Sequence, residues 1–568
     1  MLTGLPSVGS ALGLTVRVEG VSGEQEKNVL AYLEIYQAKG EKDITLQRIE
    51  LLHARAAQQI EEALLPFGFF RPKILSSLKQ SGRGSSAEWS AHYVIDPGPP
   101  IRLAAVDYRI TGEGAGDKAF AREFPLQPGD LLDQRLYEER KTELLESAAE
   151  RGYLKPELLA SEIVIDRDAY QASIKLHFDT GPKYYLGEIR FEQDELDPEF
   201  LASYLNVKPG EPYNVEKILR LQGNLLGTDY FRQVEITPLL DESRDNRVPV
   251  DIFTSPNPNN KYRFGVGFAT DYGPRVTLDW NIRRVNRRGH KGIAKLLLSP
   301  GLQEVSGEYR IPIQNPSSDY ISIKPEYIGY DTESRQGDVY QLLFAHSTGL
   351  NEWRRTLGVD LKFENYEVAD DRDNTRELVP YVSWSRTKTN NPIFTTRGKR
   401  EKLVLLGSGE GLVSTASYLQ LQASGKWIRG LGQDYRILAR ADLGATLAND
   451  VLDLSGSRRF FAGGDVSIRG FGLDETGPTN RSGEVVGGRY LAVGSLELER
   501  RVDRKWSVAA FVDGGNALDP DYDNHLAMGA GIGVRWLSPI GQIRLDLASA
   551  LSEDGNPWRF HIVIGPDL

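Results

Sequence analysis

Apolar and polar residues alternate along the C-terminal part of the chain, from Lys261 onward. Sixteen segments of about ten residues carry this period of two, which is the length of a tilted strand that crosses a bilayer. The first segment sets apolar side chains against small or polar ones: Tyr262, Phe264, Val266 and Phe268 against Arg263, Gly265, Gly267 and Ala269. The pattern predicts a 16-stranded antiparallel transmembrane β-barrel over residues 257–568, and therefore an outer-membrane protein.

Charged residues on the second face separate this prediction from a soluble β-sandwich. Glu308 and Arg310 alternate with Tyr309 and Ile311, and a sandwich core would not tolerate such charges. An even number of strands returns the chain to its starting side, so both ends of the barrel are expected to be periplasmic. This parity makes the longest connection, residues 449–488, the sixth external loop. A loop of that length is usually functional or disordered.

Residues 1–256 follow a different pattern, in which a unit of about 80 residues occurs three times. Each unit is expected to place a strand first, then two helices, then two strands, which gives a β-α-α-β-β domain of the α+β class. The sequence Asp-x-Gly-Pro closes the first two units, at 96–99 and 179–182. The expected domains are 1–97, 98–180 and 181–256, and each sheet leaves an unpaired strand edge where another chain can add a strand.

Helical periodicity is clear in the second unit, over residues 134–151. The positions that share one face form a stripe that is expected to pack on the sheet: Leu136, Tyr137, Arg140, Leu144, Leu145 and Ala148.

Composition removes several classes of function. The net charge of -11 argues against a nucleic-acid partner, and the absence of cysteine excludes disulfides and thiolate chemistry. No apolar run is long enough for a membrane-spanning helix. The stretch from Met1 to Leu14 lacks the basic and apolar parts of a signal peptide, so a mature form that begins with an added Met1 is expected.

The sequence also lacks the motifs that are typical of hydrolases, metal sites and nucleotide-binding turns. The chain has no G-x-S-x-G sequence and no histidine pair at metal-ligand spacing. Gly529, Gly531 and Gly533 lie on one face of an alternating strand rather than in a nucleotide-binding turn. We therefore expect neither catalysis nor a bound metal or cofactor.

The sixth external loop contains residues 458–472, which are too rich in glycine and aromatic residues for a solvated loop. Its tetrapeptide Ile468-Arg469-Gly470-Phe471 resembles the [Val/Ile]-Arg-Gly-[Phe/Tyr] signature of the BamA/TamA superfamily of barrel-assembly and translocation proteins, whose sixth loop folds into the barrel lumen. A second segment that looks like that superfamily's partner motif lies on the thirteenth predicted strand: Phe511, Val512, Asp513, Gly514 and Gly515.

Alternation places Phe511 and Asp513 on the lumenal face of that strand, where Asp513 is available to Arg469. A hydrogen bond between these two side chains would be charge-assisted. Removing one partner would leave the other charge buried and unpaired, at a cost of about 3 to 5 kcal/mol. The expected role is to pin the loop inside the lumen. The alternative is that Arg469 is an ordinary solvated arginine.

The three N-terminal units similarly resemble POTRA domains, the periplasmic modules of this superfamily. Three copies, rather than five or two, are typical of its TamA branch, although barrels usually end in an aromatic residue and this chain ends in Leu568. The resemblance implies POTRA domains in the periplasm, autotransporter-type clients among unfolded outer-membrane proteins, and a TamB-like inner-membrane-anchored partner that binds the POTRA domains.

Closure of the barrel requires the first strand to pair with the last, and both look poorly suited to it. Glycines weaken the register of the first strand, and a proline lacks the N-H that the last strand would donate. The alternative is that the glycines only make room for the folded loop. The residues expected at this seam are Tyr262, Phe264, Gly265, Gly267, Phe560, Ile562, Val563, Ile564, Gly565 and Pro566.

Two functions remain from these patterns. In the first, the protein is an outer-membrane insertase and translocation factor: client strands pair with the exposed edge at the seam, next to outer-membrane lipid. In the second, it is a protein-conducting pore of the two-partner-secretion type, through which a client threads once the sixth loop moves. The repeat count favours the first function.

Overall fold

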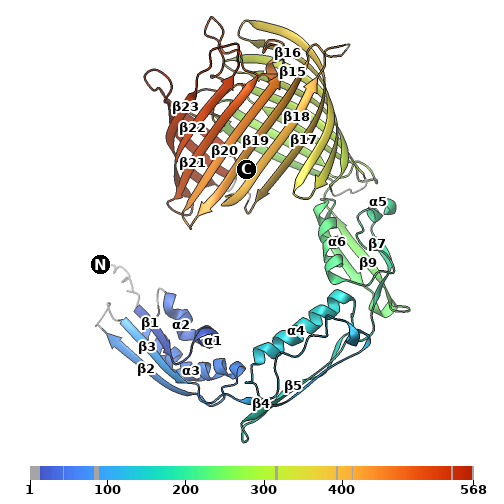
Figure 1. The fold of residues 1–568 in the computed structure, drawn as a ribbon, viewed down its shortest axis with the longest axis vertical. Coiled ribbons are helices and arrows are strands. Elements are labelled where there is room, and N and C mark those ends of the chain that lie inside the picture. The colour runs from blue at the N-terminus through green and yellow to red at the C-terminus, as the bar shows by residue number, and fades with distance from the viewer. Residues whose placement is uncertain are drawn as a thin grey trace, which may run out of the picture. The chain divides into compact units, whose positions relative to one another are not determined.

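The computed structural model describes residues 13–41, 44–81, 88–313, 318–391, 394–411, 413–538 and 541–565. Three small α/β domains precede a closed β-barrel (Figure 1), which confirms the predicted fold class. The expectation about Met1 and the predicted seam residue Pro566 lie outside these described residues. Among the helices that the model describes, none has the length and apolarity needed to cross a bilayer.

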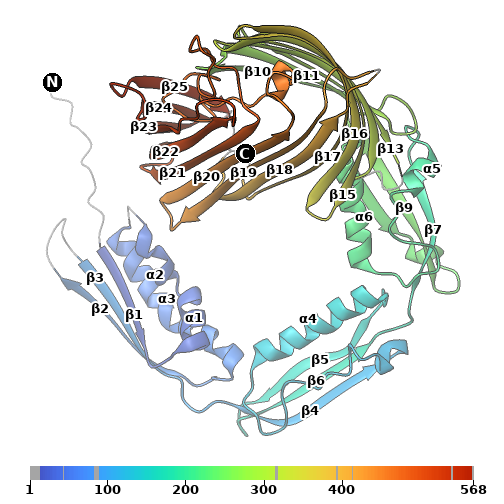
Figure 2. The ribbon, with the colours of Figure 1, turned by 45° about the horizontal axis from the view of Figure 1, so that its top comes forward.

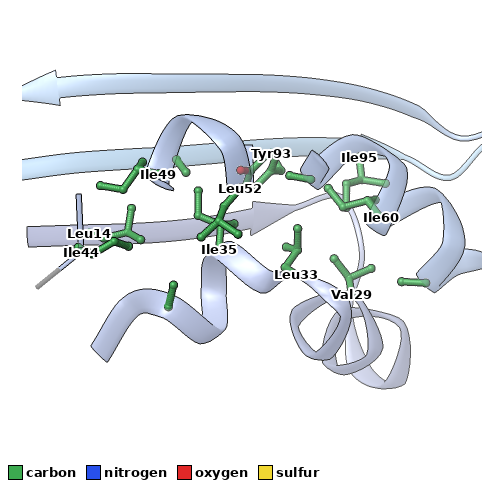
Figure 3. Packing of buried hydrophobic residues seen from close by; sticks show 14 of the residues in the cluster. Leu14, Val29, Leu33, Ile35, Ile44, Ile49, Leu52, Ile60, Tyr93 and Ile95 are labelled. Carbon is green, nitrogen blue, oxygen red and sulfur yellow. The ribbon is translucent and has the colours of Figure 1, made fainter. Parts of the chain in front are cut away.

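The first domain has a three-stranded sheet covered by helices on one face. Its central strand pairs in parallel with the first strand and antiparallel with the other. One face of its longest helix is buried at Ile49, Leu52, Ala56 and Ile60 (Figure 3), the spacing of an amphipathic helix. The elements are β1 (Gly13–Glu19), α1 (Gly23–Tyr32), α2 (Glu34–Gln37), η1 (Ala38–Gly40), α3 (Leu46–Leu64), η2 (Leu65–Phe67), β2 (Lys73–Ser81) and β3 (Glu88–Asp96).

The second domain departs from the predicted unit, because only one of its two expected helices forms. A short 3₁₀ turn and an irregular segment replace the first helix, and glycines and prolines between residues 112 and 129 account for this break. Phe120 and Phe124 of the irregular segment fill the core instead. The elements are β4 (Arg102–Thr111), η4 (Glu113–Gly116), α4 (Gln134–Arg151), β5 (Glu157–Asp166) and β6 (Gln171–Asp179).

Two positions of the predicted stripe on α4 are informative. Arg140 is buried because its guanidinium donates to the Tyr108 hydroxyl and to the carbonyls of Phe120 and Arg122. This arginine therefore holds the irregular segment where a helix was expected. Leu145, predicted to be in the core, is instead exposed.

The third domain again has a strand, two helices and two strands. Its sheet has the order β7-β9-β8, the same topology as in the other two domains. The elements are β7 (Tyr185–Glu192), α5 (Pro198–Ala202), α6 (Val215–Gly227), β8 (Phe231–Pro238), η5 (Leu240–Glu242) and β9 (Arg247–Pro256).

The barrel consists of sixteen strands, each antiparallel to its neighbours (Figure 2). Strand length varies around the wall, from 8 residues in β12 and β25 to 19 in β17. The strands are β10 (Asn260–Ala269), β11 (Gly273–Ile282), β12 (Lys291–Leu298), β13 (Leu302–Pro312), β14 (Tyr320–Asp331), β15 (Arg335–Leu350), β16 (Trp353–Val368), β17 (Asp371–Thr389), β18 (Arg397–Ser408), β19 (Tyr418–Leu431), β20 (Tyr435–Leu447), β21 (Tyr490–Arg501), β22 (Trp506–Leu518), β23 (Ala527–Ser538), β24 (Gly541–Ala550) and β25 (Trp558–Gly565).

Parts of the third domain form one compact unit with the barrel, namely Phe191–Asn206 and Leu221–Glu235. The turn between β11 and β12 is the contact point. The Tyr230 hydroxyl donates to the carbonyl of Gly289, and Arg283 and Arg287 pair with Asp229 and Asp197. The bare glycine is needed here because its φ is +70° and a Cβ would overlap the ring of Phe200.

Replacement of Gly289 by alanine is therefore expected to detach this contact. A non-glycine residue at positive φ costs about 1 to 3 kcal/mol, and the overlap adds to it. Hydrogen exchange of the amides in residues 221–235 should become faster. Gly273→Ala is the matched control, since Gly273 also has a positive φ (+76°) in a barrel turn but has only ordinary contacts with Pro300. Equal exchange in the two variants would contradict the prediction.

Candidate functional site

The connection between β20 and β21, residues 448–489, is packed as a core although it has little regular structure; we call it loop six. Val451, Leu454 and Ile468 are fully buried. Loop six is stabilised by isolated bridges between its own segments, such as Phe460 with Gly488, and by contacts with lumenal side chains of the barrel wall. It is therefore folded into the barrel, as the sequence predicts.

Arg469 is the centre of these contacts. Its Nε and one Nη donate to the two oxygens of Asp513 at 2.8 and 2.9 Å, and its backbone N-H donates to the same carboxylate at 3.0 Å. The guanidinium also lies 3.4 Å from the ring centroid of Phe511, within cation–π range. The structure thus brings together the two motifs, 44 residues apart, that the sequence linked through resemblance and strand alternation.

The sequence missed the rest of this ionic cluster. The other Nη of Arg469 donates to Glu497 at 2.8 Å and to Asp546 at 3.2 Å, and Arg535 bridges the same two carboxylates. Three carboxylates and two guanidiniums are therefore buried together, a network in which each charge has partners. Alternation placed Asp546 on the lumenal face, but it did not show which lumenal charges converge.

The neighbours of Arg469 fix the backbone of the motif. Ile468 and Phe471 are buried in a small apolar cluster with residues from the barrel wall. Gly470 has a φ of +105°, and a Cβ there would crowd the backbone at Ser549 and Ala550. The motif therefore requires glycine at this position.

Among the glycines of the wall, the predicted Gly514 turns out to be less constrained than two others. A Cβ on Gly514 would have only ordinary contacts, the nearest at 3.8 Å. On Gly529 it would overlap the carbonyl oxygen of Arg469, and on Gly515 that of Ala492. Gly529 faces Asp513 across the β22–β23 ladder, so it provides the space in which the loop motif lies.

The first half of loop six is attached to the opposite wall. Arg459 pairs with Asp371, and Arg458 with Glu377, while the ammonium of Lys362 donates to Ser455 at 2.9 Å. These contacts involve β16 and β17, the longest strands of the barrel. Loop six therefore spans the lumen from the long-strand side to the β22–β24 side.

The barrel is closed by a much weaker junction than any other in the wall. Among the described residues, β10 and β25 share one register pair, Ala269 with Val563, whereas other neighbours share from seven, as in β11–β12, to sixteen, as in β15–β16. Next to this pair, the N-H of Thr270 donates to the Ile562 carbonyl, and the Ile562 N-H donates back to the Thr270 hydroxyl. We call this junction the seam.

The predicted seam residues divide into two groups. Ile562, Val563 and Ile564 contribute to the seam. The others among the described residues lie on the two strands but pair only with the inner neighbours, β11 and β24: Tyr262, Phe264, Gly265, Gly267, Phe560 and Gly565.

The two glycines do not make room for loop six, which was the alternative considered for them. A Cβ on Gly265 or Gly267 would meet the side chains of Thr277 and Arg275, both on β11. Arg275 uses the space at Gly267 to donate to the carbonyl of Ile564 at 2.9 Å. This side-chain bond takes the place of strand pairing across the seam.

Family comparisons cover most of the chain. Residues 251–567 match the Omp85 superfamily domain, residues 15–97 match the first TamA-type POTRA domain, and residues 184–256 match a POTRA model described as a surface antigen variable number repeat.

One curated relative and two solved structures are similar to this chain. The outer membrane protein assembly factor BamA of Nitratidesulfovibrio vulgaris is 23% identical over 412 residues, 67% of this chain and 51% of that protein. This chain thus spans about half the length of that relative.

The crystal structure of BamA from Haemophilus ducreyi lacking POTRA domains 1–3 superposes with a TM-score of 0.71 at 17% identity, covering 82% of this chain and all of that one. CdiB from Acinetobacter baumannii gives 0.47 at 13% identity, with 82% and 90% covered.

Proposed function

Because the chain belongs to the Omp85 superfamily, whose barrel lies in the outer membrane with its POTRA domains in the periplasm, we propose that it assembles β-barrel clients into that membrane through the seam. The single observation that carries this proposal is the seam itself, where the described residues form one register pair while every other pair of neighbouring strands shares seven or more. The protein breaks no covalent bond in this process. Its chemistry is the exchange of backbone hydrogen bonds.

Opening the seam requires little free energy. Beside the bridge between Ala269 and Val563, three hydrogen bonds of the described residues cross it, two with Ile562 and one with the Ile564 carbonyl, and each contributes about 0.5 to 1.5 kcal/mol on a net basis. Opening therefore costs a few kcal/mol. A client strand that pairs with the free edge of β10 forms new hydrogen bonds, and these offset the cost. The exchange can then proceed without an external energy source at the barrel.

The short strands beside the seam support the same proposal. β25 has 8 residues, which at about 3.3 Å per residue and a tilt near 45° span roughly 19 Å. The apolar band of such a barrel is normally about 25 Å tall. Phe264 and Val266 of β10 are more than three-quarters exposed, so they face lipid that must thin to match the short strands. Thin lipid lowers the barrier to insertion.

The finer assignment is that the clients are autotransporter-type proteins and that a TamB-like periplasmic protein binds the POTRA domains. The match of residues 15–97 to the first TamA-type POTRA domain and the count of three domains support this assignment. Each sheet leaves two edge strands, β1 and β2 in the first domain, where an extended client or partner segment can add a strand.

A disulfide across the seam tests the proposed function. Ala269 and Val563 face each other in the register, at a separation that suits a disulfide, and the chain has no other cysteine. In the Ala269→Cys/Val563→Cys variant, oxidation should abolish assembly of a β-barrel client in reconstituted outer-membrane vesicles, and reduction should restore it.

The matched control is Ser347→Cys/Thr356→Cys, a lumenal pair that faces across the fully laddered β15–β16 junction. Oxidation of that pair should leave client assembly unchanged. Full client assembly through an oxidised seam would refute the insertase proposal. The two-partner-secretion pore would replace it if the locked barrel still secreted its client and lost secretion only when loop six was tethered to the wall.

A further inference from the structure

Three groups from distant parts of the chain meet at the outer end of the seam: Asp271, Asp465 and His561. Asp271 lies in the external turn that joins β10 to β11, Asp465 in loop six, and His561 on β25. The ligand-type atoms of the three side chains lie within 4.8 Å of one another. The cluster thus includes one group from each side of the seam and one from the loop between them.

Hydrogen bonds make loop six the bridge. The backbone N-H of Asp465 donates to the Asp271 carboxylate at 2.7 Å, and the N-H of Asp271 donates to the Asp465 carboxylate at 3.3 Å. The other oxygen of Asp465 lies 2.6 Å from Nδ1 of His561. A single loop residue therefore holds the hairpin of the first strand and the body of the last strand.

The tautomer of His561 follows from its second partner. The backbone N-H of Gly470, inside the loop motif, donates to Nε2 at 2.9 Å. A neutral imidazole has one proton, so that proton is on Nδ1 and is donated to Asp465. A metal ion at Nδ1 would move the proton to Nε2, against the N-H of Gly470. This geometry favours a hydrogen-bonded cluster over a metal site.

We propose that Asp271, Asp465 and His561 are positioning residues that latch the seam through loop six, and that protonation of Asp271 tightens this latch. The proposal rests on the proposed function, because it specifies how opening of that same seam is controlled. Strand pairing at the seam is so short that the latch supplies a large share of the contacts between its two sides.

The electrostatics of the cluster explain why a proton matters. Burial and the neighbouring Asp465 carboxylate raise the pKa of Asp271 from 3.8 to about 7. Oxygens of the two carboxyl groups lie within 4.8 Å of each other, so protonation of Asp271 removes the repulsion between two ionised carboxylates. The other charged or titratable groups around this turn are Tyr272 beside it, Arg559 on β25, Arg335 on β15, and Asp474 and Glu475 in loop six.

The direction of the pH dependence follows from the raised pKa. In the opened state Asp271 is solvated and its pKa returns toward the ordinary value, so the latched state binds the proton more tightly. The extra stability of the latch is complete below about pH 3.8 and is lost as the pH rises through about 7. The seam should therefore open more readily in neutral or alkaline than in acidic solution.

The test measures opening without any client. Ala269 is buried at the seam, so the rate at which a charged maleimide alkylates Ala269→Cys in the full chain, in vesicles, reports the open fraction. The same cysteine in an Asp271→Asn background is the reference, because the amide keeps both hydrogen-bonding roles of a protonated carboxyl but does not titrate. We divide the rate measured with Asp271 by the rate measured in the Asp271→Asn background. The pH dependence of the thiol itself cancels in this ratio.

This ratio is expected to rise about thirtyfold between pH 5.5 and pH 8.5 and to level off above the pKa of Asp271. The Asp465→Ala variant lacks the bridging carboxylate, so its cysteine should be alkylated fast at every pH. The Asp338→Asn variant lacks a carboxylate bound to Tyr327 in the wall, and its alkylation should show the same pH dependence as the unmodified latch. A flat ratio, or slow alkylation of the Asp465→Ala variant, would overturn the latch. Neither result depends on client assembly, so failure of the latch and failure of the insertase proposal are distinguishable.

Discussion

Replacement of Arg469 by methionine is expected to release loop six from the lumen. The substitution keeps most of the side-chain length but removes the guanidinium that pairs with Asp513, Glu497 and Asp546, of which Arg535 also pairs with the last two. Breaking one partner of a buried ion pair costs about 3 to 5 kcal/mol, because the remaining charge is buried without compensation. That amount exceeds what most single loop contacts contribute, so the docked loop should no longer be the dominant state.

Two measurements check this expectation. Trypsin should cleave at Arg458 and Arg459, which are nearly inaccessible in the docked loop, and the folded barrel should lose its resistance to heat in detergent. Arg310→Met is the matched control, since Arg310 pairs with Glu308 on its own strand and has no contact with the loop motif. The double variant Arg469→Met/Asp513→Asn should recover part of the loss by removing a stranded charge. Identical behaviour of the Arg469 and Arg310 variants would contradict the pinning role.

Substitution of Gly529 by alanine is expected to have an effect of similar size without changing any charge. A Cβ at this position would overlap the carbonyl oxygen of Arg469, and backbone atoms on both sides cannot move aside as the end of a flexible side chain can. Overpacking of this kind costs about 1 to 3 kcal/mol and occasionally more. Here the added cost falls on the docked loop, because Gly529 lies in a regular strand that tolerates alanine.

The same protease and heat-resistance measurements apply to the glycine variant. Gly514→Ala is the control, because Gly514 lies on the adjacent strand and has space for a Cβ. We expect Gly529→Ala to expose Arg458 and Arg459 while Gly514→Ala leaves them protected. Protection of the loop in both variants would mean that the loop motif does not depend on close approach to β23.

The success of the sequence interpretation differs between the barrel and the second domain for a physical reason. Alternation with a period of two is a local property of each strand, so it predicts the sixteen strands and places Phe511 and Asp513 on the lumenal face. The helices of a domain are harder to predict from local periodicity than the strands of the barrel. In the second domain the first expected helix was wrong, because buried aromatic residues fill the same space and Arg140 holds the irregular segment through tertiary hydrogen bonds.

The sequence by itself determined the barrel, its parity, the position of loop six and the pairing of Arg469 with Asp513, since each depends on local periodicity or on a short motif. Only the tertiary structure decided which lumenal charges surround Arg469, how short the seam is, and that Asp465 links Asp271 with His561. The seam contact between Thr270 and Ile562 joins residues 292 positions apart, and Asp465 lies 194 positions from Asp271 and 96 from His561. These contacts follow from the register and tilt with which the whole barrel closes, and no local pattern of residues specifies either one.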